Sequence, residues 1–293
     1  MAVTERDPHT GYLTTGHEWN GIKELNTPVP KAVIVFLVAT VLFSLIYWIL
    51  FPAFPLGWTY TKGLLGIDQR TTVAQSLQQA ALERQDWTQR IEAESYQAIQ
   101  TDPALMTIVR QTGRTLFGDN CAACHRFDAK GGKGFPNLTS SSWLWGGDAE
   151  AIAETIRVGI NSSHPETRVA QMLAFGRDQI LSEIEVKNVV GYVRSLFDPE
   201  AGKQIPDDQL NAGKQVFGAQ CASCHGENGK GNTSLGAPDL TDPHWIYGGD
   251  PQSLFTTVWS GRQGHMPTWE GRLGAVDRKI LALYLVDLRS RDP

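Results

Sequence analysis

All four cysteines of the chain lie in two short motifs, each with a histidine directly after its second cysteine. The motifs are Cys121-Ala-Ala-Cys124-His125 and Cys221-Ala-Ser-Cys224-His225. Two thiols three positions apart can lie on one helical turn and form thioethers with the two vinyl groups of one porphyrin edge. The histidine that follows can then bind the iron from the near side. The spacing therefore predicts two covalently bound haem c groups, one per motif.

Three other uses of paired cysteines fit the sequence less well. A zinc site needs four ligands, and each motif supplies three at most, with no second cysteine or histidine pair beside it. A thioredoxin-type redox pair would follow a strand and open a long helix, a pattern that the sequence does not show. A disulfide within either motif would be strained.

The two motifs belong to two copies of a longer unit, about a hundred residues apart. GRTLFGDN before Cys121 aligns with GKQVFGAQ before Cys221, FPNLTSSSWLWGGD aligns with APDLTDPHWIYGGD, and TIRVG aligns with TVWSG. Each copy ends in a segment with apolar residues at helical spacing, and the joint DPEAGKQIPDDQ is rich in turn formers. The repeat predicts two tandem domains, residues 110–198 and 207–291.

Each copy resembles a class I cytochrome c domain, which implies a small all-α bundle whose first and last helices cross. A glycine in the first helix of such a domain permits close approach of the two backbones. The resemblance implies that the crossing forms within each copy, so that the tyrosine of its last helix packs on its own first helix. The matching positions are Gly113, Phe117 and Tyr192 in the first copy, and Gly213, Phe217 and Tyr284 in the second.

The same resemblance assigns the haem contacts. Pro136 in FPNL and Pro238 in APDL match the proline whose carbonyl accepts a hydrogen bond from the ligand histidine and so fixes its tautomer. Met172 and Met266 match the axial methionines, although leucine replaces the usual proline after Met172. The implied iron ligands are His125 and Met172 in the first copy, and His225 and Met266 in the second.

Other side chains could compete for the irons. Met106 precedes its cysteine motif and is interpreted as a packing residue. His164 would give a bis-histidine site of lower potential if it replaced Met172, and His265 adjoins Met266. His244 is expected to be a surface group or a group behind a ligand. The tryptophans Trp143 and Trp245 are expected to pack in the core.

A single apolar segment predicts a membrane anchor. Residues 32–51 carry no charge and would span about 30 Å as a helix, the thickness of the bilayer's hydrocarbon core. A largely polar stretch of about thirty residues precedes the segment and no cleavage site follows it, which argues against a signal peptide. We expect an N-terminal cytoplasmic segment over residues 1–30, an anchor over 31–54 and a helical spacer over 55–109. Because bacteria attach haem c outside the cytoplasmic membrane, the haem domains should be periplasmic.

The N-terminal text HEWNGIKELNTPVP, the single anchor and the two haem domains together resemble the dihaem subunit of cbb3-type cytochrome c oxidase. The resemblance implies a relay that accepts electrons from a periplasmic c-type cytochrome donor. It would pass them, with a monohaem cytochrome c subunit, to a haem-copper catalytic subunit that reduces oxygen and pumps protons. The subunit itself would have no catalytic site.

Two other functions remain open from the residues alone. One is the cytochrome subunit of a periplasmic dehydrogenase, which would carry electrons away from a substrate-oxidising partner. The other is a dihaem peroxidase, which needs an open or displaceable ligand position on one iron. The formal net charge of −5 and the absence of a basic tract argue against a nucleic-acid partner.

Overall fold

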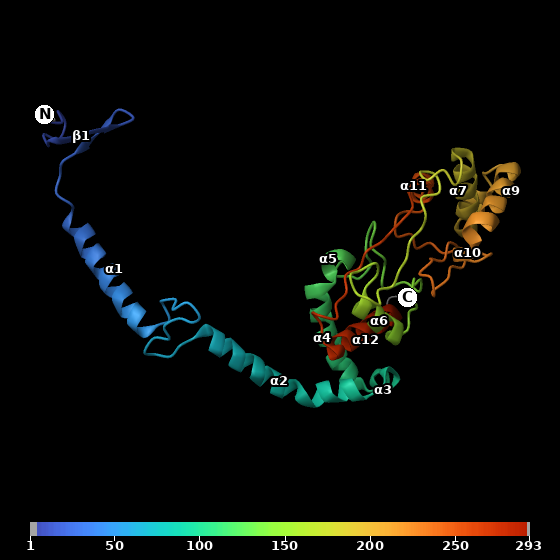
Figure 1. The fold of residues 1–293 in the computed structure, drawn as a ribbon, viewed down its shortest axis with the longest axis horizontal. Helices are drawn as coiled ribbons and strands as arrows, with labels where there is room; N and C mark the ends of the chain where they lie inside the picture. Colours follow the sequence, from blue (N-terminus) through green and yellow to red (C-terminus); the bar gives the residue numbers. More distant parts are fainter. Residues whose placement is uncertain (1–4, 292–293) are drawn as a thin grey trace. The chain divides into compact units, whose positions relative to one another are not determined.

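The computed structural model describes residues 5–291 and divides into two compact units (Figure 1). The first unit ends at Glu83 and the second begins at Arg84, within one long helix.

The first unit opens with a β-hairpin and continues into an apolar helix. Strands β1 (Thr14–Trp19) and β2 (Ile22–Leu25) pair antiparallel across Asn20-Gly21, both at positive φ, as a tight hairpin turn requires. Helix α1 (Lys31–Leu50) has a mean hydropathy of 2.7 and buries none of its side chains against protein. Within residues 5–291, α1 is the one helix long and apolar enough to cross a membrane.

A carboxylate orders the chain between α1 and the next helix, α2 (Gln69–Ala93). Asp68 accepts hydrogen bonds from the hydroxyl of Tyr60 at 2.6 Å, the Lys62 ammonium at 2.8 Å and the backbone N–H of Arg70 at 3.0 Å. The bonds from Lys62 and Tyr60 hold the pKa of Asp68 well below its usual range. Asp68 thus fixes the start of α2.

The second unit is helical, which confirms the predicted all-α class. Its helices are α3 (Tyr96–Thr101), α4 (Pro103–Asn120), α5 (Ala122–His125), α6 (Ala149–Val158), α7 (Glu183–Phe197), α8 (Pro199–Gly202), α9 (Asp207–Val216), the π-helical turn η1 (Phe217–Cys221), α10 (Ala222–His225), α11 (Pro251–Ser260) and α12 (Ala275–Arg291).

Side-chain caps start the principal helices where the sequence places Asp or Ser. Asp102 caps α4, Asp148 caps α6 and Asp250 caps α11, each by accepting backbone N–H groups that have no partner within the helix. Ser182 and Glu185 form a reciprocal capping box at the start of α7. The corresponding caps of α6 and α11 reflect the sequence repeat.

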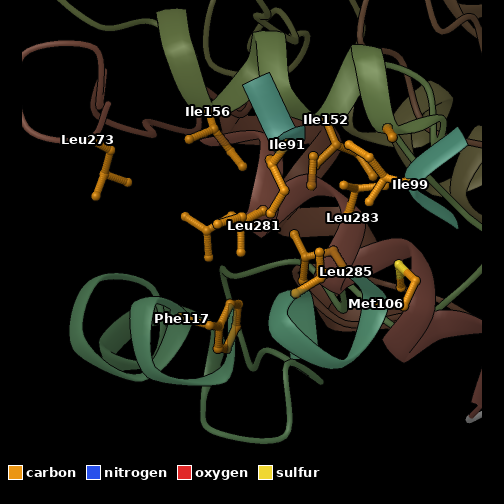
Figure 2. Packing of buried hydrophobic residues seen from close by; sticks show 14 of the residues in the cluster. Ile91, Ile99, Met106, Phe117, Ile152, Ile156, Leu273, Leu281, Leu283 and Leu285 are labelled. Atoms are coloured by element: carbon orange, nitrogen blue, oxygen red, sulfur yellow. The ribbon is translucent and has the colours of Figure 1, made fainter. Parts of the chain in front are cut away.

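The first core of the second unit lies among α4, α6 and α12, and Figure 2 shows its packing. Phe117 from α4 and Ile152 from α6 pack there with Leu281 of α12. Ile91 and Ile99 are fully buried in the same core, so it extends well before the expected domain start at residue 110. Met106 is also buried there, as a packing residue should be.

The second core lies among α7, α9, η1 and α11. Its buried residues include Val189 of α7, Phe217 of η1 and Leu254 of α11. The second core therefore takes its last helix, α7, from the first sequence copy, and the first core takes its last helix, α12, from the second copy.

The helix crossings are not the expected ones, in which the first and last helices of the same copy would pack together. A Cβ added at Gly113 would lie 2.6 Å from the Cβ of Tyr284, and one added at Gly213 would lie 2.8 Å from that of Tyr192. The aromatic contacts agree, since Phe117 packs on Tyr284 and Phe217 on Tyr192. The crossing glycines and aromatics keep their roles, but the copies exchange their last helices.

Chain connectivity gives a physical reason for the exchange. Only residues 198–206, with the short helix α8, connect α7 to α9, and such short links place consecutive helices side by side. Because the copies are similar in sequence, α7 can fill the place of a last helix beside α9. Helix α12 then packs against α4.

A double-mutant cycle would test this exchange in solution. We expect Phe117→Leu and Tyr284→Leu to show a coupling energy of about 1 kcal/mol, since such aromatic pairs contribute roughly 0.5–1.5 kcal/mol beyond burial. The cycle of Phe117→Leu with Tyr192→Leu should show no coupling. The measurement is denaturant unfolding of the full chain in detergent. Coupling to Tyr192 in place of Tyr284 would contradict the exchanged packing.

Candidate haem-binding sites

The first cysteine motif lies where α4 ends and the single turn α5 begins. The turn presents Cys121 partly buried and Cys124 exposed, with His125 at its end. Arg126 follows at φ +64, a conformation that reverses the chain away from the histidine. The backbone N–H of Gly131 then donates to the carbonyl of His125 at 3.0 Å.

The His125 ring is oriented by a backbone carbonyl. Its Nδ1 lies 3.2 Å from the carbonyl oxygen of Pro136, which can only accept, so the proton resides on Nδ1 and the lone pair on Nε2. Burial lowers the pKa of His125, although the Pro136 bond opposes this. A neutral imidazole with a free Nε2 is the form that binds iron.

The second motif repeats this geometry in the other core. Cys221 is buried, Cys224 is exposed, and His225 ends α10. The His225 Nδ1 lies 3.0 Å from the Pro238 carbonyl oxygen, and burial lowers the pKa of this histidine too. Gly226 takes the positive-φ position that Arg126 occupies in the first copy. Both histidines thus contact the proline carbonyl that the resemblance to class I cytochrome c implies.

A cavity of about 860 Å³ opens beside His125 and continues toward the second motif. Apolar side chains of Ile152 and Ile156 line it together with His125 and Met266. Residues 230–233 and 237–239, which follow the second cysteine motif, also line it. A cavity of this size and apolar lining suits a porphyrin between His125 and Met266.

Polar groups in the cavity also suit a porphyrin with carboxylate substituents. The indole Nε1 groups of Trp145 and Trp245 are buried, line the cavity and lack a hydrogen-bond acceptor among the described residues. The Arg168 guanidinium lies 5.1 Å from the Trp145 ring. Buried donors without acceptors are costly, and carboxylates would satisfy them. Trp143 donates to the Ser140 carbonyl and packs against the first core, and Trp245 packs against the second core, as expected for both.

The two methionines follow the exchanged helices. Met266 and Cys121 both pack against the first core, and Met266 lines the cavity with His125. Met172 packs against the second core, which contains Cys221. The resemblance pairs each methionine with the histidine of its own copy. The structure instead places Met266 in the cavity with His125, and it packs Met172 against the core that contains Cys221. The reason is the exchange of the chain segments that end each copy.

Backbone pairing fixes both methionine segments. Met266 exchanges two backbone hydrogen bonds with Ile160, both at 2.9 Å, and Met172 exchanges two with Arg262, at 2.8 and 3.0 Å. Gly159 and Gly261 precede these partners at φ +70, and a Cβ at Gly261 would lie 2.5 Å from the Met172 carbonyl oxygen. A Cβ at Gly159 would likewise overlap the carbonyl of Met266. The glycine that ends TIRVG and TVWSG was the sequence signal for this pairing.

The competing histidines lie elsewhere. His164 donates from Nε2 to Glu270 at 2.7 Å and accepts the Glu166 backbone N–H at Nδ1, at 3.0 Å. Both ring nitrogens are thus engaged away from either cysteine motif. His265 and His244 are exposed, and His244 lies at the rim of the cavity.

Sequence reasoning missed two groups around the methionine segments. Arg157 pairs with Glu154, Glu166 and Glu270, so it joins residues of both sequence copies. These carboxylates raise the pKa of Arg157 well above its usual range. The side chain of Asn161 contacts both methionine segments. Neither residue lies in a motif, and each has one partner more than a hundred residues away, Glu270 for Arg157 and Gly264 for Asn161.

Comparisons with known proteins agree with the geometry. Residues 11–58 match the family model described as the N-terminal domain of cytochrome oxidase-cbb3, FixP. Residues 111–197 match the model for cytochrome c, and residues 208–285 match cytochrome C oxidase, cbb3-type, subunit III.

Similar proteins extend over nearly the whole chain. The cbb3-type cytochrome c oxidase subunit FixP of Bradyrhizobium sp. (strain ORS 278) is 44% identical over 97% of each chain. The subunit CcoP of Azospirillum brasilense is 40% identical over 98% of this chain and 99% of its own. That of Cereibacter sphaeroides is 38% identical over 93% of each. With two cytochrome c repeats behind one apolar helix, the chain belongs to the family of subunit III of cbb3-type cytochrome c oxidases.

Proposed function

We propose that the chain is a membrane-anchored dihaem cytochrome c that relays electrons from a periplasmic c-type cytochrome to the catalytic subunit of a cbb3-type oxidase. That subunit would reduce oxygen to water with proton pumping, next to a monohaem cytochrome c subunit. The names of the similar proteins support the oxidase. The relay itself is supported by one observation, the two oriented histidines His125 and His225, each at the end of a CxxCH turn.

Two haem c groups would be held covalently, one by Cys121 and Cys124 and one by Cys221 and Cys224. When bound, each haem supplies a one-electron Fe(III)/Fe(II) couple. We propose that His125 and Met266 bind one iron, while His225 and Met172 bind the other. The shared cavity lining of His125 and Met266 supports this pairing.

The chain's own residues would then favour electron transfer and would exclude reaction of the irons with oxygen or peroxide. Pro136 and Pro238 hold each histidine in the tautomer that presents Nε2 to the iron. If each iron binds one of these histidines and one thioether, no ligand position would remain for oxygen or peroxide. Thioether ligation also favours the reduced iron and raises its potential.

The anchor would place both haem domains on the periplasmic side of the bacterial inner membrane, with residues 1–30 in the cytoplasm. Arg6, Lys23 and Lys31 precede the apolar core of α1 and favour an inside N-terminus. Haem attachment outside the cytoplasmic membrane requires the same orientation.

Purification of the full chain from its native membrane in mild detergent would test this function. We expect covalent haem c at two per chain, low-spin spectra, and co-purification with a haem-copper subunit that consumes oxygen. Treatment with acidified acetone should leave the haem on the chain. A substrate-oxidising dehydrogenase as the co-purifying partner would contradict the oxidase. Peroxide turnover by the isolated chain would contradict a pure relay.

A further inference from the structure

The side chain of Asn161 lies between the two segments that carry the methionines. Its Nδ2 donates to the carbonyl oxygen of Ala170 at 2.8 Å and to that of Gly264 at 2.7 Å. Its Oδ1 accepts the Ala170 backbone N–H at 3.2 Å. Ala170 is two residues before Met172, and Gly264 is two residues before Met266. One amide therefore holds the approach to both methionines.

The position of Asn161 in the backbone explains how it reaches both segments. It directly follows Ile160, which pairs with Met266 and also forms a parallel bridge with Arg168. Asn161 thus lies just after the end of α6, where the backbone pairs both with the segment that leads to Met172 and with the segment that contains Met266.

The residue type suits this place for two reasons. The backbone of Asn161 has φ +49, a conformation that asparagine tolerates better than most residues. Its amide also has two donor hydrogens and an acceptor, which match two carbonyls and one N–H. Aspartate would keep the size and the backbone tolerance, but it could not donate to either carbonyl.

We propose that Asn161 is a positioning residue that couples the two methionine segments, so that retention of the thioether at each iron depends on the same side chain. The proposal rests on the His/Met ligation proposed above, although it does not depend on which methionine serves which iron. Each segment would lose one donated hydrogen bond when the amide is removed. A hydrogen bond of this kind changes an equilibrium by about fivefold.

Displacement of the methionines by imidazole in the oxidised full chain tests the proposal. The variants are Asn161→Gly, which accepts positive φ but removes the side chain, and Asn161→Asp, which retains it without the donor. We expect each to bind imidazole about fivefold more tightly at both haems. Both reduction potentials should also fall. Thioether ligation stabilises Fe(II) more than Fe(III), so a weaker iron–methionine bond destabilises the reduced form more than the oxidised form.

Two control variants disturb one methionine segment each. Thr268 Oγ1 donates to the Arg157 carbonyl at 2.6 Å, on the Met266 side, and Thr257 Oγ1 accepts from Arg262 Nη2 at 2.9 Å, on the Met172 side. Thr268→Val should therefore change the imidazole affinity and potential of only the haem that Met266 serves. Thr257→Val should change those of only the haem that Met172 serves.

The proposed coupling is refuted if either Asn161 variant changes the imidazole affinity and the reduction potential of only one haem. It is also overturned if the variants lower thermal stability with both imidazole affinities and both potentials unchanged, since that would be a structural role alone. Failure of the unaltered chain to show two thioether-ligated haems would instead refute the proposed function.

Discussion

Met266→His is expected to lower the reduction potential of the haem that we propose on Cys121 and Cys124, and to leave the potential of the haem proposed on Cys221 and Cys224 unchanged. Replacing thioether by imidazole removes the ligand that favours Fe(II). We expect a fall on the order of 0.1 V, within the roughly 0.8 V range that axial ligands span. Met172→His should have the reciprocal effect. The reason is the exchanged packing, which places Met266 in the cavity with His125.

The measurement needs a label that tells the two haems apart. Cys124→Ala would leave the first haem with one thioether and one intact vinyl group, whose conjugation shifts its absorption to longer wavelength. Cys224→Ala would label the second haem in the same way. Spectroelectrochemical titration then assigns each potential to a labelled haem. A fall in the potential of the haem on Cys221 after Met266→His would show that each sequence copy binds its own iron.

Gly213→Ala is expected to destabilise the second core, by about 3 kcal/mol, the upper end of the usual cost of overpacking. In an ordinary exposed helix position this substitution stabilises, because glycine is a poor helix former. Here the new Cβ would overlap the carbonyl of Asn188 in α7 and lie 2.8 Å from the Cβ of Tyr192. Helices α7 and α9 would have to separate, and Met172 packs against the core that they form.

Gly218→Ala is the matched control, because a Cβ there has no neighbour within 4 Å. It lies in η1, directly after α9, and should be neutral or slightly stabilising. The measurement is denaturant unfolding of the full haem-loaded chain, monitored by the haem on Cys221 and Cys224. Equal stability of the two glycine variants would contradict the close crossing of α7 and α9.

The sequence alone predicted the local features, because these depend on residues close together in the chain. The cysteine motifs and the apolar helix α1 follow from spacing or composition within short segments, and the resemblance to class I cytochrome c domains located the prolines that orient the histidines. The resemblance also identified the crossing residues Gly113 and Phe117, because each matches a position of the family's first helix. The all-α class followed from the same resemblance.

Tertiary structure alone decided which segments pair. Because the two copies are similar, the first helix of each could pack against the last helix of either copy. Tyr192 and Tyr284 could each fill the aromatic position at either crossing, so the sequence does not decide between the two arrangements. The short connection between α7 and α9 favours one of them, and the methionines follow their helices into the other copy's core. Asn161 escaped sequence analysis for the same reason, because its carbonyl partner at Gly264 is brought near by the exchange and by nothing local in the chain.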